Sequence, residues 1–476
     1  MGQSEVVGVA SPDPEARGSA GSVATQGAAR ALGSTRHPLT KRPAAAAPPR
    51  QRDEARSSMH SDKSCIRLRV LTLNCWGIRY LSKQCSERYD LLQKRLLAEK
   101  YDIVMLQEVW SEKDYLQIKD STRETYPHSH YFRSGVIGSG LCILSKHPLV
   151  DTLLFKYSVN GYPYMVNHGD WFGGKAVGLA VIDIGGITVN TYITHLHAEY
   201  NREKDAYHPH RVLQAWELAQ VIRHTSHVAN VVLLGGDLNM HPGDLGNRLL
   251  RSVAGLTDSY EKAQKYEGPQ DGCTLLPQNC FTCKNELATF PNGIRIDYIL
   301  YKGVAGFSMS CEAVHTTTGI SIDGQGLPLS DHESVTATLL IKIPDPKLAK
   351  PSPLAESSEE QEVLEEARAE VARGFRHAER RRTLSAQLGS LSGGLLLLQV
   401  VALVASTLRW MLISGSQPDD PGLSSTLFCS SELGMCALAT AVVALVMYIL
   451  FSAESKALRG AEEEIKTKMN RRGADP

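Results

Sequence analysis

Between about residue 65 and residue 343 the chain alternates apolar and polar positions in short runs that predict β-strands. The first run, 66–74, reads IRLRVLTLN, and its alternation and branched side chains are typical of a half-buried strand. Helical patterns are fewer, at 88–99 and 209–225. Because strand follows strand more often than βαβ alternation allows, we expect an α/β fold of two mixed sheets flanked by helices. Further strands are expected at 102–108, 140–144, 176–182, 188–195, 231–235, 296–301 and 334–343.

Two long apolar stretches near the C-terminus predict helices that cross a bilayer. They cover residues 391–413 and 431–451, and each is close to the roughly 20 residues that a membrane-spanning helix needs. The first contains Gln399 and Arg409, which are costly in lipid, so a buried core helix is the alternative for it. Since no neighbouring segment could bury two such helices, we expect a transmembrane hairpin.

The charges beside these stretches predict the orientation of the hairpin. The short loop at 414–430 has Asp419 and Asp420 and no lysine or arginine, whereas basic residues flank both spans. The positive-inside rule therefore places the loop in a lumen and the tail at 452–476 in the cytosol, together with the large domain. We expect a multi-pass protein of the endoplasmic reticulum or another endomembrane, because short spans suit a thin bilayer. The basic residues are Arg373, Arg376, Arg380, Arg381 and Arg382 before the first span and Lys456, Arg459, Lys466, Lys468, Arg471 and Arg472 after the second.

Composition limits the partners and the folded part of the chain. Lysine plus arginine and aspartate plus glutamate both number 51, so no global positive field exists and we expect no nucleic acid partner. Residues 1–60 are rich in Ala, Pro, Ser, Gly and Arg and poor in large apolar residues, which predicts disorder. The folded domain is expected at 65–343, followed at 344–390 by a linker and a solvated, charged helix.

Short polar signatures stand at, or just after, the ends of the predicted strands. A single Asp or Asn in such a place is more often a turn former than a ligand. The ordered set is more informative, because asparagine and carboxylate oxygens are the hard ligands that Mg²⁺ prefers, and it indicates a metal-dependent phosphodiesterase site. The signatures are LNCWG with Asn74, LQEV with Glu108, THLH with His195, GGDLNM with Asp237 and Asn239, RIDY with Asp297, and LSDHE with Asp331 and His332.

This ordered set resembles the endonuclease/exonuclease/phosphatase superfamily, the deoxyribonuclease I-like fold, over about residues 67–340. Within it the chain resembles the neutral sphingomyelinases through LNCWGI, GSGLCILSKHP, NGYPYM, HGDWF, GKAVGL, THLHAEY and GDLNMHP. The resemblance implies a four-layer αββα sandwich of two mixed β-sheets and magnesium-dependent hydrolysis of sphingomyelin to ceramide and phosphocholine. Lyso-phosphocholine lipids are further candidate substrates, and a nuclease or inositol-phosphate phosphatase of the same fold is the alternative function.

The resemblance also implies a metal site. It assigns Glu108 and Asn74 to hold Mg²⁺ against the substrate phosphate, with Asp331 contributing through a water molecule. The metal would neutralise charge on the phosphoryl oxygens, and electrostatic help of this kind is typically the largest catalytic contribution.

The remaining signatures receive proton-handling and positioning roles from the resemblance. His332 would be the general base for the attacking water, a task that suits a histidine because its ordinary pKa lies near neutrality. Asp297 would orient one of the histidines, and which one stays open. Asp237 and Asn239 would position water and phosphate, and His195 would stabilise or protonate the departing ceramide oxygen.

The segment 169–176, GDWFGGKA, scans as a near P-loop. Ala176, however, stands where a nucleotide-binding loop has serine or threonine, so we expect Lys175 to contact a lipid phosphate instead. The nearby aromatic residues have two interpretations that stay open, namely packing of the loop or contact with a bilayer or a choline head group. They are Tyr162, Tyr164, Trp171 and Phe172.

Overall fold

The computed structural model describes residues 65–284, 287–319, 326–344, 358–413 and 421–472. The segment predicted to be disordered, 1–60, and most of the predicted linker after residue 344 lie outside the described residues.

The first sheet is built around the strand that the sequence shows most clearly. β1 (Cys65–Asn74) pairs parallel with β2 (Ile103–Gln107) and antiparallel with β13 (Val335–Lys342), so the sheet is mixed. Its seven strands run in the order β10-β12-β13-β1-β2-β4-β3. The other members are β3 (His128–Phe132), β4 (Leu141–Ser145), β10 (Ala263–Glu267) and β12 (Ser308–Thr316).

The second sheet has six strands in the order β5-β6-β7-β8-β11-β9. β7 (Ile187–His195) pairs parallel with β8 (Val231–Asp237), which pairs antiparallel with β11 (Asp297–Gly303). The two sheets bury branched side chains against each other, because residues of both belong to one hydrophobic core cluster. The predicted sandwich of two mixed sheets is confirmed. The remaining strands are β5 (Leu149–Lys156), β6 (Ala176–Ile184) and β9 (Thr257–Asp258).

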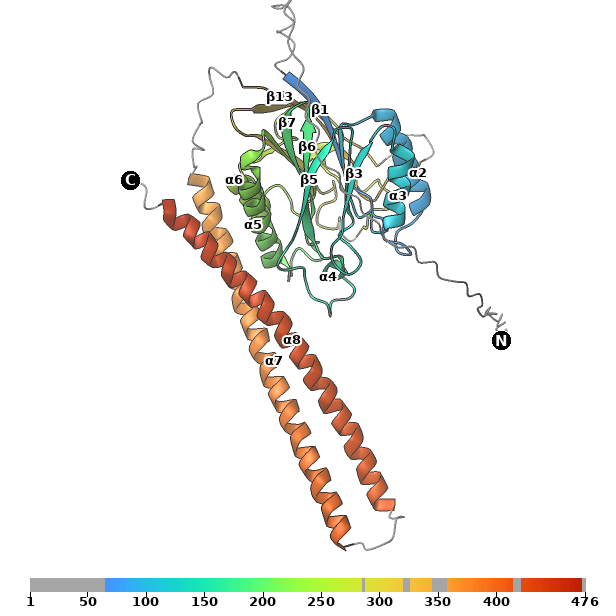
Figure 1. Cartoon of the computed structure of the whole chain (residues 1–476), viewed down its shortest axis with the longest axis vertical. Helices are drawn as coiled ribbons and strands as arrows, with labels where there is room; N and C mark the ends of the chain where they lie inside the picture. The colour runs from blue at the N-terminus through green and yellow to red at the C-terminus, as the bar shows by residue number, and fades with distance from the viewer. Residues whose placement is uncertain (1–64, 285–286, 320–325, 345–357, 414–420, 473–476) are drawn as a thin grey trace, which may run out of the picture. The chain divides into compact units, whose positions relative to one another are not determined.

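Helices cover the outer faces of both sheets (Figure 1). α2 (Cys85–Glu99) and α3 (Glu112–Thr122) share a core with β1, β2 and β4, whereas α5 (His208–Thr225) and α6 (Leu245–Ala254) share one with β7, β8 and β11. The order of layers is therefore αββα. The short α4 (Asp170–Gly173) precedes β6.

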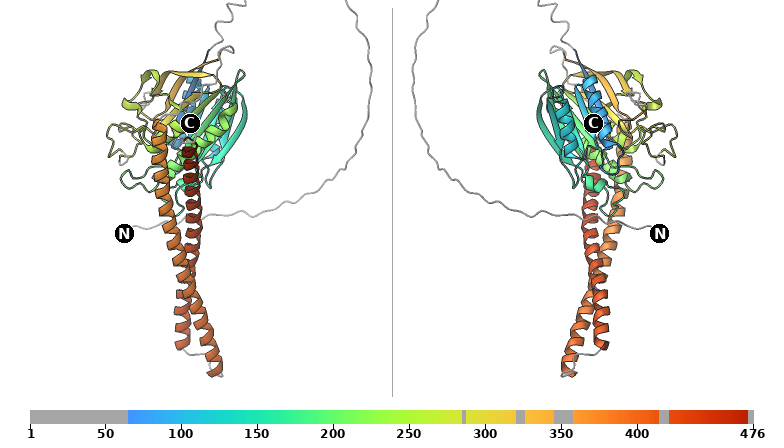
Figure 2. Two further views of the ribbon diagram at one scale, coloured as in Figure 1. Left: turned by 90° about the vertical axis from the view of Figure 1, so that its left-hand side faces the viewer. Right: turned by 90° about the vertical axis from the view of Figure 1, so that its right-hand side faces the viewer.

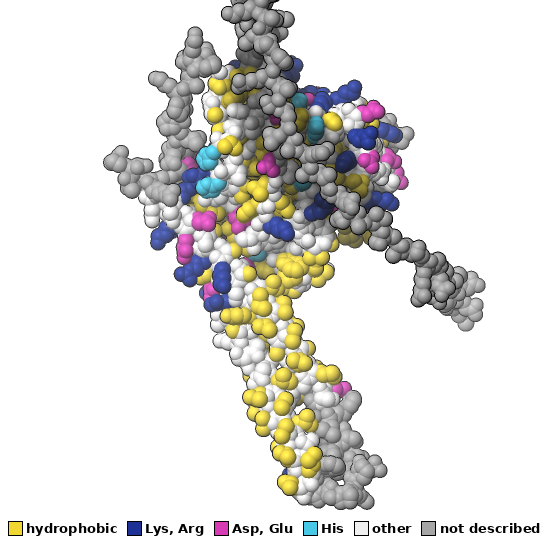
Figure 3. Space-filling view, in the orientation of Figure 1, with side chains coloured by type: hydrophobic (Ala, Val, Ile, Leu, Met, Phe, Trp, Pro, Cys, Tyr) yellow, Lys and Arg dark blue, Asp and Glu magenta, His cyan; other side chains and the backbone are white. Residues whose placement is uncertain are grey.

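Two long helices follow the sandwich. α7 (Ser358–Ile413) and α8 (Pro421–Arg472) pack along one another (Figures 1 and 2). Both are long and apolar enough to cross a membrane, and only 6% and 11% of their most apolar windows are buried. Figure 3 shows hydrophobic side chains over much of the visible face of this helix pair.

The ends of these helices differ from the predicted boundaries. α7 passes from the charged segment into the first apolar stretch without a break at residue 390, and α8 begins within the predicted loop 414–430. A helix is present in the predicted charged segment, but the prediction that it is solvated is wrong for one face, because Val363, Leu364 and Val371 of α7 are buried in the core that contains α5 and α6. Its many charges hid a sparse apolar stripe at helical spacing.

Candidate active site

Strand register brings the polar signatures of the second sheet together. His195, the last residue of β7, pairs with Asp237, the last residue of β8, and Asp237 also pairs with Asp297 at the start of β11. In the first sheet, Asn74 ends β1 beside the residue that precedes Glu108. These ends all lie at the same edge of the sandwich, because side-chain contacts join them across the two sheets.

Asn74 makes the connection between the sheets. Its amide nitrogen donates to Oε1 of Glu108 and to Oδ2 of Asp237, both at 3.0 Å, and its oxygen accepts the backbone N–H of Trp76. Glu108 has a left-handed backbone with φ of 56°, which turns the chain sharply after β2, and its other oxygen accepts a hydrogen bond from Trp110. The amide of Asn74 therefore holds the carboxylates of Glu108 and Asp237 close to each other.

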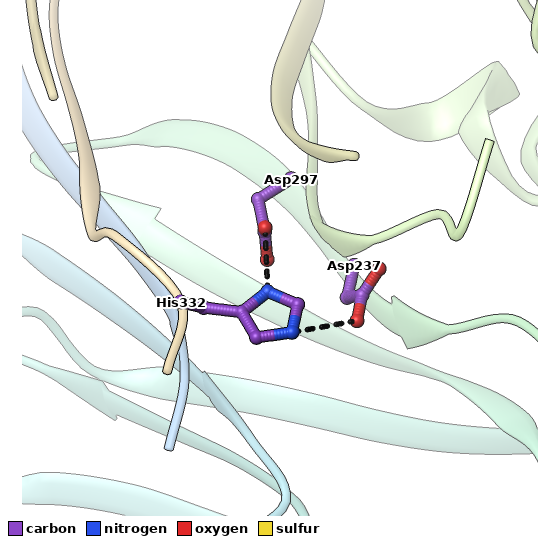
Figure 4. Close-up of side chains that lie close together, drawn as sticks. All are labelled: Asp237, Asp297 and His332. Atoms are coloured by element: carbon purple, nitrogen blue, oxygen red, sulfur yellow. Dashed lines mark hydrogen bonds and ion pairs between the residues drawn. The ribbon is translucent and has the colours of Figure 1, made fainter. Parts of the chain in front are cut away.

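His332 stands between two aspartates (Figure 4). Its Nδ1 lies 2.8 Å from Oδ2 of Asp297, and its Nε2 lies 3.9 Å from Oδ2 of Asp237. His195 contacts Asp237 through Nε2 at 3.4 Å instead. The histidine that contacts Asp297 is therefore His332, which answers the question that the sequence left open.

The two histidines differ in charge. Burial opposes a charge on His332, but Asp297 and Asp237 outweigh it and hold the pKa of His332 well above its usual value. Burial holds the pKa of His195 well below its usual value, so this imidazole is neutral at physiological pH. Burial and the charge of Asp297 raise the pKa of Asp237 to about 7.

Asn239 and Asp331 approach the site from loops. Asn239 also has a left-handed backbone, with φ of 49°, and its side chain donates to the carbonyl of Leu196 while its N–H donates to Asp237. Asp331 accepts a hydrogen bond from Ser330 at 3.1 Å. Both side chains line the same cavity as His332.

Lys175 is buried and forms an ion pair with Asp170 at 2.8 Å. Asp170 also accepts a hydrogen bond from Tyr200 at 2.6 Å, and Lys175 and His197 hold its pKa below the usual value although burial opposes this. Sequence reasoning missed Asp170 as a site residue. The signal was present, because Asp170 stands five residues before Lys175 in the segment that scans as a near P-loop.

One cavity of about 970 Å³ collects these groups, a volume at the upper end for a ligand site. All the predicted site residues except Asn74 and Asp297 line this cavity. Those two contact residues that line it. Its polar lining includes Glu108, Lys175, His195, Asp237, Asn239, Asp331 and His332, and its apolar lining includes Trp76, Ile78, Leu81, Trp110, Ile137 and Phe172.

The donor atoms of the cavity suit a hard divalent cation. Carboxylate and amide oxygens of Glu108, Asp331 and Asn239 line it, which is the chemistry that Mg²⁺ prefers. Among the described residues, Asp237, Asp297 and His332 form a further group whose donor atoms lie within 4.8 Å of one another, close enough to hold a metal ion.

Comparisons with known proteins identify the family of this chain. The model of the Endonuclease/Exonuclease/phosphatase family matches residues 71–332. Sphingomyelin phosphodiesterase 2 of Homo sapiens is 49% identical over 344 residues, which cover 72% of this chain and 80% of that protein, and the protein of the same name from Rattus norvegicus is 45% identical, covering 85% and 92%.

Two more distant similarities complete the comparison. Inositol phosphosphingolipids phospholipase C of Saccharomyces cerevisiae is 31% identical and covers 51% of this chain and 58% of that protein. The crystal structure of beta toxin from Staphylococcus aureus is 18% identical, with a TM-score of 0.45, and covers 57% of this chain and 99% of that one. From the family match and the two close relatives, the chain belongs to the endonuclease/exonuclease/phosphatase family and, within it, to the group of the sphingomyelin phosphodiesterase 2 proteins.

Proposed function

We propose that this chain is a magnesium-dependent, membrane-anchored sphingomyelinase that hydrolyses sphingomyelin to ceramide and phosphocholine. One observation carries the proposal: carboxylates from both sheets meet His332 around a single cavity, and apolar side chains line another part of the same cavity. A phosphodiester needs the polar part, and the lipid part of the substrate needs the apolar part. The names of the close relatives and the two apolar helices support the same substrate.

Glu108 is the main metal ligand in this proposal, with Asn74 beside it and Asp331 acting through a water molecule. Bound Mg²⁺ supplies charge neutralisation at the phosphoryl oxygens. We prefer this set to the group of Asp237, Asp297 and His332, because Nδ1 of His332 is already engaged by Asp297 at 2.8 Å. That short contact is the geometry of a base and the carboxylate that orients it.

His332 is the general base. With Nδ1 donating to Asp297, Nε2 is the atom left to take a proton from the attacking water, which bonds to phosphorus as the bond to the ceramide oxygen breaks. The raised pKa of His332 makes it a strong proton acceptor once its resting proton has left. Asp237 and Asn239 hold the water and a phosphoryl oxygen at the cavity wall.

His195 stabilises the leaving ceramide oxygen as a neutral hydrogen-bond donor, while a water molecule protonates that oxygen and is itself restored by the proton that His332 releases. Its lowered pKa makes it a poor source of a proton, so of the two roles considered for it we favour stabilisation over protonation. Lys175 offers a positive charge to the substrate phosphate, and the ion pair with Asp170 fixes its position.

The location follows from the helices. We propose that α7 and α8 cross an endomembrane, such as that of the endoplasmic reticulum, with the active site in the cytosol and the connection between the helices in the lumen. The clusters of arginine and lysine on the domain side of both apolar stretches support this orientation.

The test is release of phosphocholine by the purified full chain. Sphingomyelin and lyso-platelet-activating factor are compared with and without Mg²⁺, and His332→Ala is compared with His227→Ala, which changes an exposed histidine outside the cavity. We expect Mg²⁺-dependent release from sphingomyelin that His332→Ala abolishes and His227→Ala preserves. Cleavage of a nucleic acid or an inositol phosphate in place of either choline lipid would overturn the proposal.

A further inference from the structure

Three loops of the catalytic domain expose large apolar side chains. Tyr80 is fully exposed, Val136 is 73% exposed and Val166 is 67% exposed. A soluble surface rarely gathers such residues without a partner for them. We call the set the apolar rim, and it consists of Tyr80, Leu81, Val136, Ile137, Tyr164 and Val166.

Part of the apolar rim lies at the opening of the active-site cavity. Leu81 and Ile137 both line the cavity and are exposed to solvent, so the cavity opens where they stand. The backbone N–H groups of Val136 and Ile137 donate to the carbonyl of Phe172, another lining residue, at 2.9 and 3.1 Å. The loop of Val136 is therefore fixed against the cavity wall.

The same rim touches the helix pair. The ring of Tyr164 is stacked on that of Tyr162 at 5.2 Å and lies 6.4 Å from the ring of Phe451 in α8. One turn further along α8, Glu454 accepts a hydrogen bond from the hydroxyl of Tyr162 at 2.7 Å. Tyr164, one member of the apolar rim, thus lies beside the point where α8 meets the domain.

The length of the uncharged part of α8 indicates how deep the contact between Tyr164 and Phe451 lies in a membrane. Residues 433–453 contain no charged residue. At about 1.5 Å per residue they span about 31 Å, nearly equal to the hydrocarbon thickness of about 30 Å. The whole stretch is needed to cross, so Phe451 lies at the bilayer surface. Tyr164, which contacts it, then lies at the same level.

The charges of the three loops suit a lipid surface. Residues 78–84, 133–140 and 161–168 contain no aspartate or glutamate. Their two arginines, Arg79 and Arg133, are paired with Asp114 and Glu112. Nothing in these loops would repel the anionic head groups of a cytosolic leaflet.

We propose that the apolar rim inserts into the lipid leaflet in which α7 and α8 are anchored and joins the cavity opening to it. A substrate lipid then enters the cavity from the leaflet without exposing its chains to water. This inference rests on the proposed function for its substrate. The insertion itself can be measured without turnover.

The first test measures insertion. Val136→Trp and Tyr80→Trp in the full chain are reconstituted into phosphatidylcholine vesicles with brominated acyl chains. The control is Val228→Trp, because Val228 is 83% exposed in the turn that follows α5, at the opposite end of that helix from His210, which contacts Glu454. We expect at least twofold quenching of the added fluorescence at positions 136 and 80 and none at 228. Equal quenching at all three positions overturns the proposal.

The second test measures whether the apolar rim is needed to cleave sphingomyelin in a bilayer. Val136→Asp, Val166→Asp and the control Val228→Asp are reconstituted into phosphatidylcholine vesicles that contain sphingomyelin, and they are also assayed on a monomeric short-chain sphingomyelin. We expect the two rim variants to lose at least tenfold on vesicles and less than twofold on the soluble substrate. Equal loss on both substrates contradicts a role in bilayer contact.

Two further outcomes separate the possible failures. If no variant or parent chain cleaves either substrate but the quenching pattern appears, the proposed function fails and the insertion stands. If quenching is absent and Val136→Asp abolishes self-association measured by light scattering in detergent, the rim contacts a second copy of the chain and the insertion is wrong.

Discussion

Asp297 and His332 stand 35 positions apart in the sequence, yet the carboxylate of the first accepts a hydrogen bond from Nδ1 of the second at 2.8 Å. The aspartate opens β11 of one sheet, and the histidine lies on the loop that leads into β13 of the other. The contact therefore joins the two sheets at the site, as the amide of Asn74 does on the other side of Asp237.

Replacement of this aspartate is expected to change the pH profile of catalysis. In Asp297→Asn the charge that raises the pKa of His332 is lost, so the pKa falls and the acidic limb of kcat/KM moves to lower pH. The rate above the limb is expected to drop by about 10²-fold or more, because the base loses its orientation and strength. A pH series of kcat/KM checks this, and an unshifted limb would show that another group controls it.

Removal of the main metal ligand is expected to weaken the response to magnesium. For Glu108→Gln we expect the Mg²⁺ concentration that gives half-maximal activity to rise about tenfold or more, because an amide is a weaker ligand than a carboxylate. The measurement is a Mg²⁺ titration of phosphocholine release after treatment with a chelator. The control is Glu112→Gln. Glu112 is exposed, forms an ion pair with Arg133 and does not line the cavity, so its replacement is expected to leave the titration unchanged.

The contact between the domain and α8 is expected to stabilise the protein. Glu454 is hydrogen-bonded to Tyr162 and to His210, which is buried, at 2.7 and 2.9 Å. Glu454→Ala leaves both partners without this acceptor and is expected to cost about 1–3 kcal/mol, or several degrees in Tm. Thermal unfolding in detergent measures the effect. Glu463→Ala, an exposed position on the same helix, should leave Tm nearly unchanged.

Glu217 on α5 is expected to make stability depend on pH. Burial raises its pKa from 4.5 to about 7, and the nearby Glu464 adds to the rise. The folded state favours the protonated carboxyl of Glu217. The contribution of this group to the free energy of unfolding is therefore complete below pH 4.5 and is lost as pH rises through 7, by up to about 3 kcal/mol. Glu217→Gln removes this loss, so its Tm should exceed that of the parent chain at pH 8 and approach it at pH 5. A Tm difference independent of pH would contradict this assignment.

The sequence predicted most central strands but missed the edge strands and also β12, which pairs with β10 and β13 inside the first sheet. β2 and β8 are buried on both faces, and their nearly continuous apolar runs stand out in the sequence. β3 and β10 are short, polar and at sheet edges, so their side chains carry no periodic signal. The same masking by polar residues hid the core-facing stripe of α7.

The sequence also placed the site residues near strand ends but could not pair them. The contact between His195 and Asp237 depends on the register of two parallel strands, which no local pattern encodes. For the aromatic segment, packing is confirmed for Tyr162, and contact of its neighbours with a bilayer or a choline head group stays a prediction. Tyr162 is packed between Phe451 and His210, whereas Tyr164 remains half-exposed beside it.

The unbroken course of α7 limits where the enzyme can work. The helix leaves the core shared with α5 and α6 and continues to residue 413 with no loop in between, so the described apolar part of α7 is joined to the catalytic domain by continuous helix. A domain on a long flexible tether could sample a neighbouring membrane, but under the proposed anchoring this one would reach only the lipids beside its own helices. Turnover would then depend on lateral diffusion of substrate within one leaflet, and sphingomyelin in a separate vesicle would remain intact.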